Sequence, residues 1–224
     1  MNTKYDVMIL GTGEAGIYAA YELALSCPSA RVLVVDKGAD IYRRQCPIVV
    51  GKVKTCVQCP VCGTMCGFGG AGAFSDGKFN FTTAFGGWLT DFLEEKEVME
   101  LIGCVDALNV KHGATTEVYS TSTPTARALE REALKYDLHL LQAQCKHLGT
   151  ENNLKILTSI YEAIRDRHTF RFDTAVTEIQ AGDGAYTLVT EGGERFTAPC
   201  LIAGPGRSGA EWFANQCKGL GLEL

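Results

Sequence analysis

The sequence predicts an α/β protein built on a parallel β-sheet, and three observations support this fold class. An apolar run at 5–10 leads directly into a glycine-rich turn and then a stretch rich in helix-favouring residues. A second apolar run ends in Asp36. Nearer the C-terminus, strand-like runs alternate with glycine-containing turns, which is typical of a β-meander. The strand–helix–strand order indicates a crossover between two parallel strands.

Length, composition and charge exclude several classes of protein. The chain has 224 residues, 46% of them apolar, which allows one substantial core and an insert. The formal net charge is −5 and no basic stripe is present, which argues against nucleic acid or an anionic membrane as a partner. Apolar runs fall far short of the roughly 20 residues that a membrane span needs. Residues 1–10 lack the pattern of a secretory signal, so we expect a cytoplasmic protein.

The turn after the first strand has the form G-x-G-x-x-G. Gly11 permits a tight turn, Gly13 lets the backbone approach a pyrophosphate, and Gly16 allows close helix–strand contact. The N-terminus of the next helix offers N–H groups and a positive dipole end to phosphates. Asp36 is expected to accept hydrogen bonds from both ribose hydroxyls and to repel a 2′-phosphate. The motif therefore predicts a dinucleotide, either FAD or NAD; a purely structural turn is the alternative.

The rest of the chain supplies further expected elements. Residues 79–113 indicate a helical segment, and a helix is expected to begin with Thr123 as its N-cap and Pro124 in its first position. A strand is expected at 138–144. Residues 152–164 have helical spacing and predict a helix whose apolar face comprises Leu154, Leu157, Ile160, Tyr161 and Ile164.

The order of these elements favours FAD over NAD. A βαβ start, a long insert and a three-strand meander that closes on a second glycine-rich strand end resemble the Rossmann-like FAD-binding domain of the glutathione-reductase type. On this basis 1–85 and 146–224 form the FAD-binding domain, which includes a cysteine-rich loop at 46–66. Residues 86–145 form a mainly helical insert.

Several stretches carry a closer resemblance: GTGEAGIYAAYEL, VVDKG, RRQCPI, CGFGGAGAFSDGKFNFTT, FGGWLTDFL, HLGTENNLKIL and LIAGPGRSGAEWF. With them the chain resembles the N-terminal half of FAD-dependent dehydrogenases related to FixC-type flavoproteins. The resemblance implies FAD, oxidoreduction, and a small molecule or protein as electron donor or acceptor, but no particular substrate. Because members of that family are longer, it also implies either a fragment or a complementing C-terminal chain.

The resemblance also implies the cofactor contacts. Ser75 and Asp76 are expected to hydrogen-bond flavin or ribityl oxygens, and Lys78 to favour the reduced, anionic flavin unless it is a solvated surface lysine. His147 is a candidate acid or base, with a structural histidine as the alternative. The expected FAD contacts are Gly11, Gly13, Glu14, Ala15, Gly16, Asp36, Lys37, Gly69, Gly70, Ala71, Ser75, Asp76, Gly77, Val176, Gly204, Gly206 and Arg207.

Four cysteines precede the glycine-rich segment with the spacing C-x₂-C-x₂-C-x₃-C: Cys56, Cys59, Cys62 and Cys66. Short successive gaps allow a loop to present several sulfurs to one cluster, as in bacterial ferredoxins. The fourth ligand is either Cys66 or Cys46. A [4Fe–4S] cluster that exchanges electrons with FAD is therefore predicted. Zinc and redox-active free thiols are the alternatives, and a metal that only stiffens the loop is a further one.

Taken together, the residues and the resemblance predict an FAD-dependent oxidoreductase. Two other classes stay open at this point. One is a non-catalytic nucleotide-binding or assembly module stiffened by zinc, and the other is the NAD-binding half of a dehydrogenase.

Overall fold

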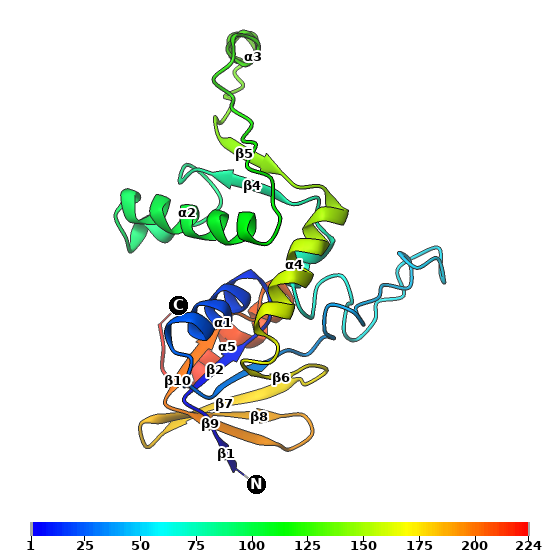
Figure 1. Ribbon diagram of the computed structural model, residues 1–224, viewed down its shortest axis with the longest axis vertical. Coiled ribbons are helices and arrows are strands. Elements are labelled where there is room, and N and C mark those ends of the chain that lie inside the picture. The colour runs from blue at the N-terminus through cyan, green and yellow to red at the C-terminus, as the bar shows by residue number, and fades with distance from the viewer. Residues whose placement is uncertain (1, 224) are drawn as a thin grey trace. The chain divides into compact units, whose positions relative to one another are not determined.

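The computed structural model describes residues 2–223 and divides into two units, which are treated separately. The first unit comprises Met1–Phe74 and Leu157–Leu224, and the second comprises Ser75–Ile156. The ribbon with its labelled elements is shown in Figure 1. The predicted helical insert at 86–145 lies inside the second unit.

The first unit contains the predicted parallel sheet. Its strand order is β10-β2-β3-β6, with all neighbours parallel: β10 (Cys200–Ala203), β2 (Val7–Leu10), β3 (Val32–Val35) and β6 (Thr169–Arg171). Helix α1 (Glu14–Ser26) is the crossover between β2 and β3, and it buries Ile17, Ala20 and Ala24. Every residue of β3 is buried, as expected for a strand covered on both faces.

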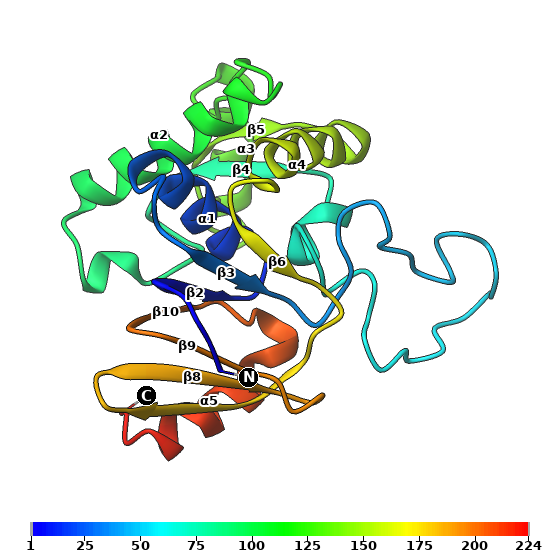
Figure 2. The ribbon, with the colours of Figure 1, turned by 60° about the horizontal axis from the view of Figure 1, so that its bottom comes forward.

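A second sheet in this unit is formed largely by the predicted meander. Strands β7 (Val176–Gly182), β8 (Ala185–Thr190) and β9 (Arg195–Ala198) are antiparallel, and β1 (Asn2–Lys4) pairs parallel to β9. Figure 2 shows this layer next to the parallel sheet. The core between the two sheets consists of Met8, Leu10, Leu33, Val35, Ile179, Leu188, Phe196 and Ala198. The fold class that the sequence predicts is therefore confirmed.

The chain returns to the edge of the parallel sheet with β10, which is followed by a short 3₁₀ turn, η3 (Arg207–Gly209), and by helix α5 (Ala210–Gly219). Trp212 and Phe213 of α5 pack against the core between the sheets. A further apolar cluster lies where Phe68, fully buried, contacts Tyr161 with ring centroids 4.7 Å apart. Phe170 and Phe172 complete this cluster.

The second unit combines a two-stranded antiparallel sheet with helices. Its elements are β4 (Lys78–Phe81), η2 (Leu89–Asp91), α2 (Glu95–Lys111), α3 (Pro124–Leu134), β5 (Gln144–His147) and the first part of α4 (Thr150–Ile164). The buried Lys146 of β5 places its Nζ 2.7 Å from both carboxylate oxygens of Asp106 in α2. This ion pair fixes α2 to the small sheet.

Helix α3 begins as predicted. The Thr123 Oγ1 accepts a hydrogen bond from the Ala126 N–H at 3.1 Å, and Pro124 occupies the first helical position. The prediction of a strand at 138–144 is wrong. Residues 138–143 form no strand, and Leu138, Leu140 and Leu141 are exposed. Strand β5 starts only at Gln144, where β4 offers a partner in register.

The buried face of α4 differs from the expected one by about one position. Leu154 is 39% exposed, whereas Ile156 is buried together with Leu157, Ile160 and Ile164. Residues 79–113 likewise contain β4 and a loop before α2 begins. In both cases the partner surface, which the local spacing does not encode, decides which residues are buried.

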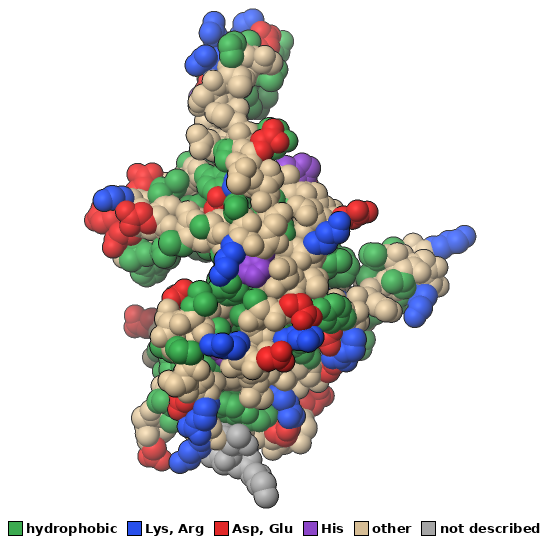
Figure 3. Space-filling view, viewed as in Figure 1, with side chains coloured by type: hydrophobic (Ala, Val, Ile, Leu, Met, Phe, Trp, Pro, Cys, Tyr) green, Lys and Arg blue, Asp and Glu red, His purple; other side chains and the backbone are tan. Residues whose placement is uncertain are grey.

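Charged side chains of both signs lie on the surface. On the face in Figure 3, Lys and Arg side chains are interspersed with Asp and Glu side chains. Within residues 2–223, no helix combines the length and the apolar character needed to cross a bilayer.

Candidate nucleotide-binding pocket

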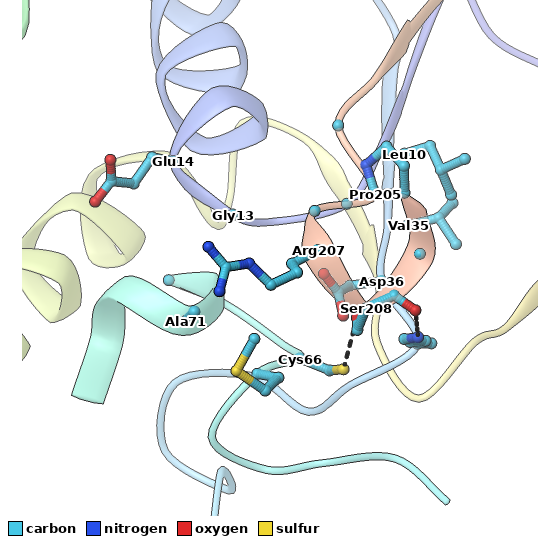
Figure 4. Close-up of a pocket in the computed structure, with 18 of the residues that line it drawn as sticks. Leu10, Gly13, Glu14, Val35, Asp36, Cys66, Ala71, Pro205, Arg207 and Ser208 are labelled. Carbon is cyan, nitrogen blue, oxygen red and sulfur yellow. Dashed lines mark hydrogen bonds between the residues drawn. The ribbon is translucent and has the colours of Figure 1, made fainter. Parts of the chain in front are cut away.

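A cavity of about 410 Å³ lies in the first unit, at the carboxyl ends of β2, β3 and β10. This edge is where open parallel sheets bind ligands. Figure 4 shows the side chains around it. Of the cofactor contacts expected from the sequence, those lining the cavity are Gly11, Gly13, Glu14, Asp36, Lys37, Gly69, Gly70, Ala71, Val176, Gly204, Gly206 and Arg207.

The three positions of the motif are glycine for different structural reasons. Gly11 has φ +95°, and a Cβ there would lie 2.2 Å from the carbonyl oxygen of Gly204. A Cβ on Gly16 would lie 1.9 Å from the carbonyl oxygen of Gly11. Gly13 has φ −71°, and a Cβ there would have no protein atom within 4 Å. The fold therefore requires the first and third glycines, whereas nothing in the described protein requires the second.

The N-terminus of α1 opens onto the cavity without a side-chain cap. Gly13 is the N-cap residue and makes no side-chain hydrogen bond to the helix, and both Gly13 and Glu14 line the cavity. The first N–H groups of a helix need partners, and its dipole favours a negative charge. This end of α1 is therefore suited to a phosphate group.

Asp36 is buried and accepts four hydrogen bonds from protein donors. Its Oδ2 accepts from the N–H and the Oγ1–H of Thr12, both at 2.7 Å. Its Oδ1 accepts from the N–H of Gly38 at 2.7 Å and of Gly67 at 2.9 Å. The expected ribose acceptor is thus already fully engaged within the protein.

Two cations and one further acid line the same cavity. Arg207 extends across it, with its guanidinium between Gly13 and Ala71 (Figure 4). The Nζ of Lys37 lies 3.4 Å from the carbonyl oxygen of Ser208. Burial raises the pKa of the Glu14 carboxyl above its ordinary value. The two cations favour an anionic ligand, and Glu14 is the group that opposes it.

The cysteine-rich loop reaches the cavity through its last residues. Met65 and Cys66 line the cavity, and the buried Cys66 places its Sγ 3.4 Å from the Oγ of Ser208. The hydroxyl of Thr64, 3.1 Å from the Cys62 Sγ, is the largest cause that lowers the pKa of that thiol.

The predicted metal site finds no support in the placement of the cysteines. Cys46, Cys56, Cys59, Cys62 and Cys66 are all free thiols. No group of three or more His, Cys, Asp or Glu side chains within residues 2–223 is arranged to hold a metal ion.

A buried arginine organises the end of the loop. Arg44 donates from Nε and Nη2 to the carbonyl oxygen of Gly63 and from Nη1 to that of Phe68. Its guanidinium also lies 4.9 Å from the centroid of the Phe74 ring, and burial lowers its pKa.

The remaining predicted residues form a separate charged cluster in the second unit. The Asp76 Oδ2 lies 3.2 Å from Lys78 Nζ and 3.5 Å from His147 Nε2, and all three side chains are about half-exposed. Lys78 is the main cause that lowers the pKa of Asp76. The Ser75 Oγ accepts from the Gly77 N–H at 3.3 Å. The two weak catalytic candidates therefore share one carboxylate.

Sequence reasoning missed several lining residues. Pro205, Ser208 and Gly209 belong to the second glycine-rich strand end and follow from it directly. The sequence predicts Cys66 only as a metal ligand, and Met65 and Trp212 carry no signal of their own. Of the predicted contacts in the first unit, Ala15 and Gly16 lie next to the cavity lining rather than in it.

No protein-family model matches the sequence, and no curated protein matches it. Among the solved structures that match over the whole chain are glycine oxidase from Geobacillus kaustophilus (TM-score 0.54, 17% identity), L-amino acid deaminase from Proteus vulgaris (0.54, 12%) and NikD, an unusual amino acid oxidase essential for nikkomycin biosynthesis (0.54, 14%). The chain spans 60%, 51% and 56% of those chains, respectively. This likeness shows that the chain shares the fold of these two oxidases and of the deaminase over the part of their length that it spans.

Proposed function

We propose that this chain binds FAD through the cavity of its first unit and forms the cofactor-binding part of an oxidoreductase. One observation carries the proposal. Gly13 stands at an uncapped helix N-terminus beside a cavity of about 410 Å³, and a Cβ on Gly13 would meet no atom within 4 Å from outside its own stretch of chain. A glycine that the protein itself does not need is explained by a ligand backbone or phosphate that lies against it.

The residues around the cavity fit the ADP half of FAD. The N–H groups at the start of α1 would receive the pyrophosphate, and Arg207 would pair with it from the opposite wall. Lys37 adds a second positive charge to the lining. When bound, FAD would supply the hydride and electron transfer, and the role of these residues is to bind and orient it.

Other parts of the proposal rest on likeness alone. The solved structures named above act on amino acids according to their names, and the sequence resembles FAD-dependent dehydrogenases; neither assigns a substrate to this chain. We propose a cytoplasmic oxidoreductase with a small molecule or a protein as electron partner, completed by a C-terminal region. The proposal does not include the iron–sulfur cluster or zinc predicted from the cysteine spacing, because the cysteines within residues 2–223 are not arranged as a ligand group.

Titration of the full chain with FAD, NAD⁺ and ADP tests the proposal. We expect saturable binding of FAD that quenches flavin fluorescence, competition by ADP, and reversible photoreduction of the bound flavin. Arg207→Met should weaken FAD binding about tenfold or more, since a hydrogen bond to a charged group is lost. Arg127→Met, on the exposed surface of α3, is the matched control and should bind like the wild type. A folded chain that does not bind FAD, or that binds NAD⁺ in preference, would overturn the proposal.

A further inference from the structure

We infer that Asp36 is a positioning residue that joins three segments of the cavity wall, and that it does not accept the ribose hydroxyls of the bound dinucleotide. This inference rests on the proposed function. Asp36 directly follows β3, where an acidic side chain is expected to recognise ribose. The inference assigns it a different role.

The hydrogen bonds of Asp36 leave no acceptor capacity. An ionised carboxylate offers about four lone-pair sites. Thr12 takes two of them through its N–H and Oγ1–H, and the N–H groups of Gly38 and Gly67 take the other two, all between 2.7 and 2.9 Å. The residue is only 8% exposed. A ribose hydroxyl that bonded to this carboxylate would have to displace a protein donor, which would then be left unsatisfied in a buried place.

The four donors belong to three residues, which come from three different parts of the wall. Thr12 belongs to the glycine-rich turn after β2, Gly38 follows β3, and Gly67 ends the cysteine-rich loop. Backbone contact between the last two is very close, because a Cβ on Gly38 would lie 2.4 Å from the Gly67 nitrogen. The carboxylate therefore fastens the loop end to both strand ends.

Thr12 and Gly67 lead directly into residues that line the cavity. The Gly69 N–H donates to the Thr12 carbonyl oxygen at 2.8 Å, so the turn and the start of η1 (Gly70–Phe74) are fixed to each other as well. Gly13 follows Thr12 in the chain, and Cys66 precedes Gly67. Loss of the Asp36 bonds would thus loosen the wall that holds the ligand without removing a ligand contact.

The short side chain of aspartate explains this arrangement. Asp36 bonds to the N–H of Gly38, two residues further along, which is the geometry of an Asx turn. The carboxylate of Asp36 is thus held by backbone donors although the residue lines the cavity.

A double-mutant cycle between protein and ligand separates positioning from direct contact. The affinities of wild type and Asp36→Asn for ADP and for 2′-deoxy-ADP are measured by calorimetry. We expect Asp36→Asn to weaken both ligands by the same factor, so that the ratio of the two affinities changes by less than about twofold. Direct acceptance from the 2′-hydroxyl would instead make this ratio collapse by about tenfold or more in the variant, and that outcome would overturn the inference.

Thr12→Val tests the same idea where Asp36→Asn fails to fold. It removes one donor to Asp36 and should weaken both nucleotides equally, and Thr12→Ser should restore binding because it keeps the hydroxyl. Thr190→Val is the matched control: it removes a buried threonine hydroxyl that accepts from the Glu194 N–H, and it should leave both affinities unchanged. Equal losses in Thr12→Val and Thr190→Val would overturn the inference. If neither ADP nor FAD binds the folded wild type, the proposed function fails first and the inference with it.

Discussion

Gly13→Ala is the substitution that most clearly separates the demands of the fold from those of the ligand. At Gly13 the backbone has φ −71° and ψ −176°, which any L-residue adopts, and the new methyl group would meet no protein atom within 4 Å. Alanine gains about 0.4–1 kcal/mol by stiffening the unfolded chain. It loses a similar amount because it is a poor N-cap. The free energy of unfolding should therefore change by less than about 1 kcal/mol.

The affinity for FAD should fall much further. The methyl group occupies the space in which the pyrophosphate is proposed to lie, and overpacking of a close contact typically costs about 1–3 kcal/mol. This corresponds to a loss of between about fivefold and 150-fold in affinity. Urea unfolding followed by circular dichroism gives the first quantity, and quenching of FAD fluorescence gives the second.

The other two glycines of the motif provide matched controls. Gly16→Ala would place a Cβ 1.9 Å from the Gly11 carbonyl oxygen, and Gly11→Ala would place one 2.2 Å from that of Gly204 at φ +95°. Both should destabilise the chain by about 2 kcal/mol or more, since backbone atoms must move. Gly13→Ala with wild-type FAD affinity, or with a stability loss like that of Gly16→Ala, would refute the reasoning.

Three further predictions concern charged groups. Asp106→Asn should destabilise the second unit by about 1.5–3 kcal/mol in urea unfolding, because the buried Lys146 ammonium loses its hydrogen bonds to a carboxylate that is itself 25% exposed; an effect below about 1 kcal/mol would contradict this role of the pair. Hydrogen bonds from Arg31 lower the pKa of Asp6 from 3.8 to about 2, so its stabilising effect is complete above about pH 4 and disappears as the pH falls through 2. The unfolding midpoints of wild type and Asp6→Asn should accordingly differ at pH 5 and converge near pH 2, and a constant difference would argue against the pair. Glu14→Gln should strengthen FAD binding by about 1 kcal/mol, or fivefold, because a negative charge leaves the phosphate site; unchanged affinity would place the phosphates elsewhere.

Local sequence patterns predicted the parts of the fold that local chemistry determines. The βαβ unit follows from the glycine spacing and the two apolar runs, and the N-cap of α3 follows from Thr123 and Pro124. The meander follows from alternation and turn residues. These signals lie within a few residues of the structure they determine, so one sequence is enough to read them.

Features that depend on distant partners were not accessible in this way. Whether 138–144 pairs depends on β4, and β4 pairs only from Gln144 onward. The cysteine spacing suggested a metal, whereas the return of the loop to the cavity depends on Arg44 and two carbonyl groups. The engagement of Asp36 depends on Gly67, a donor 31 residues away.

A crystal structure of the chain with FAD tests the central claim most directly. We expect the pyrophosphate to lie against Gly13 at the N-terminus of α1, with the Arg207 guanidinium within hydrogen-bond distance and the ADP half inside the cavity. FAD bound at another site, or a pyrophosphate that contacts neither Gly13 nor Arg207, would contradict the account.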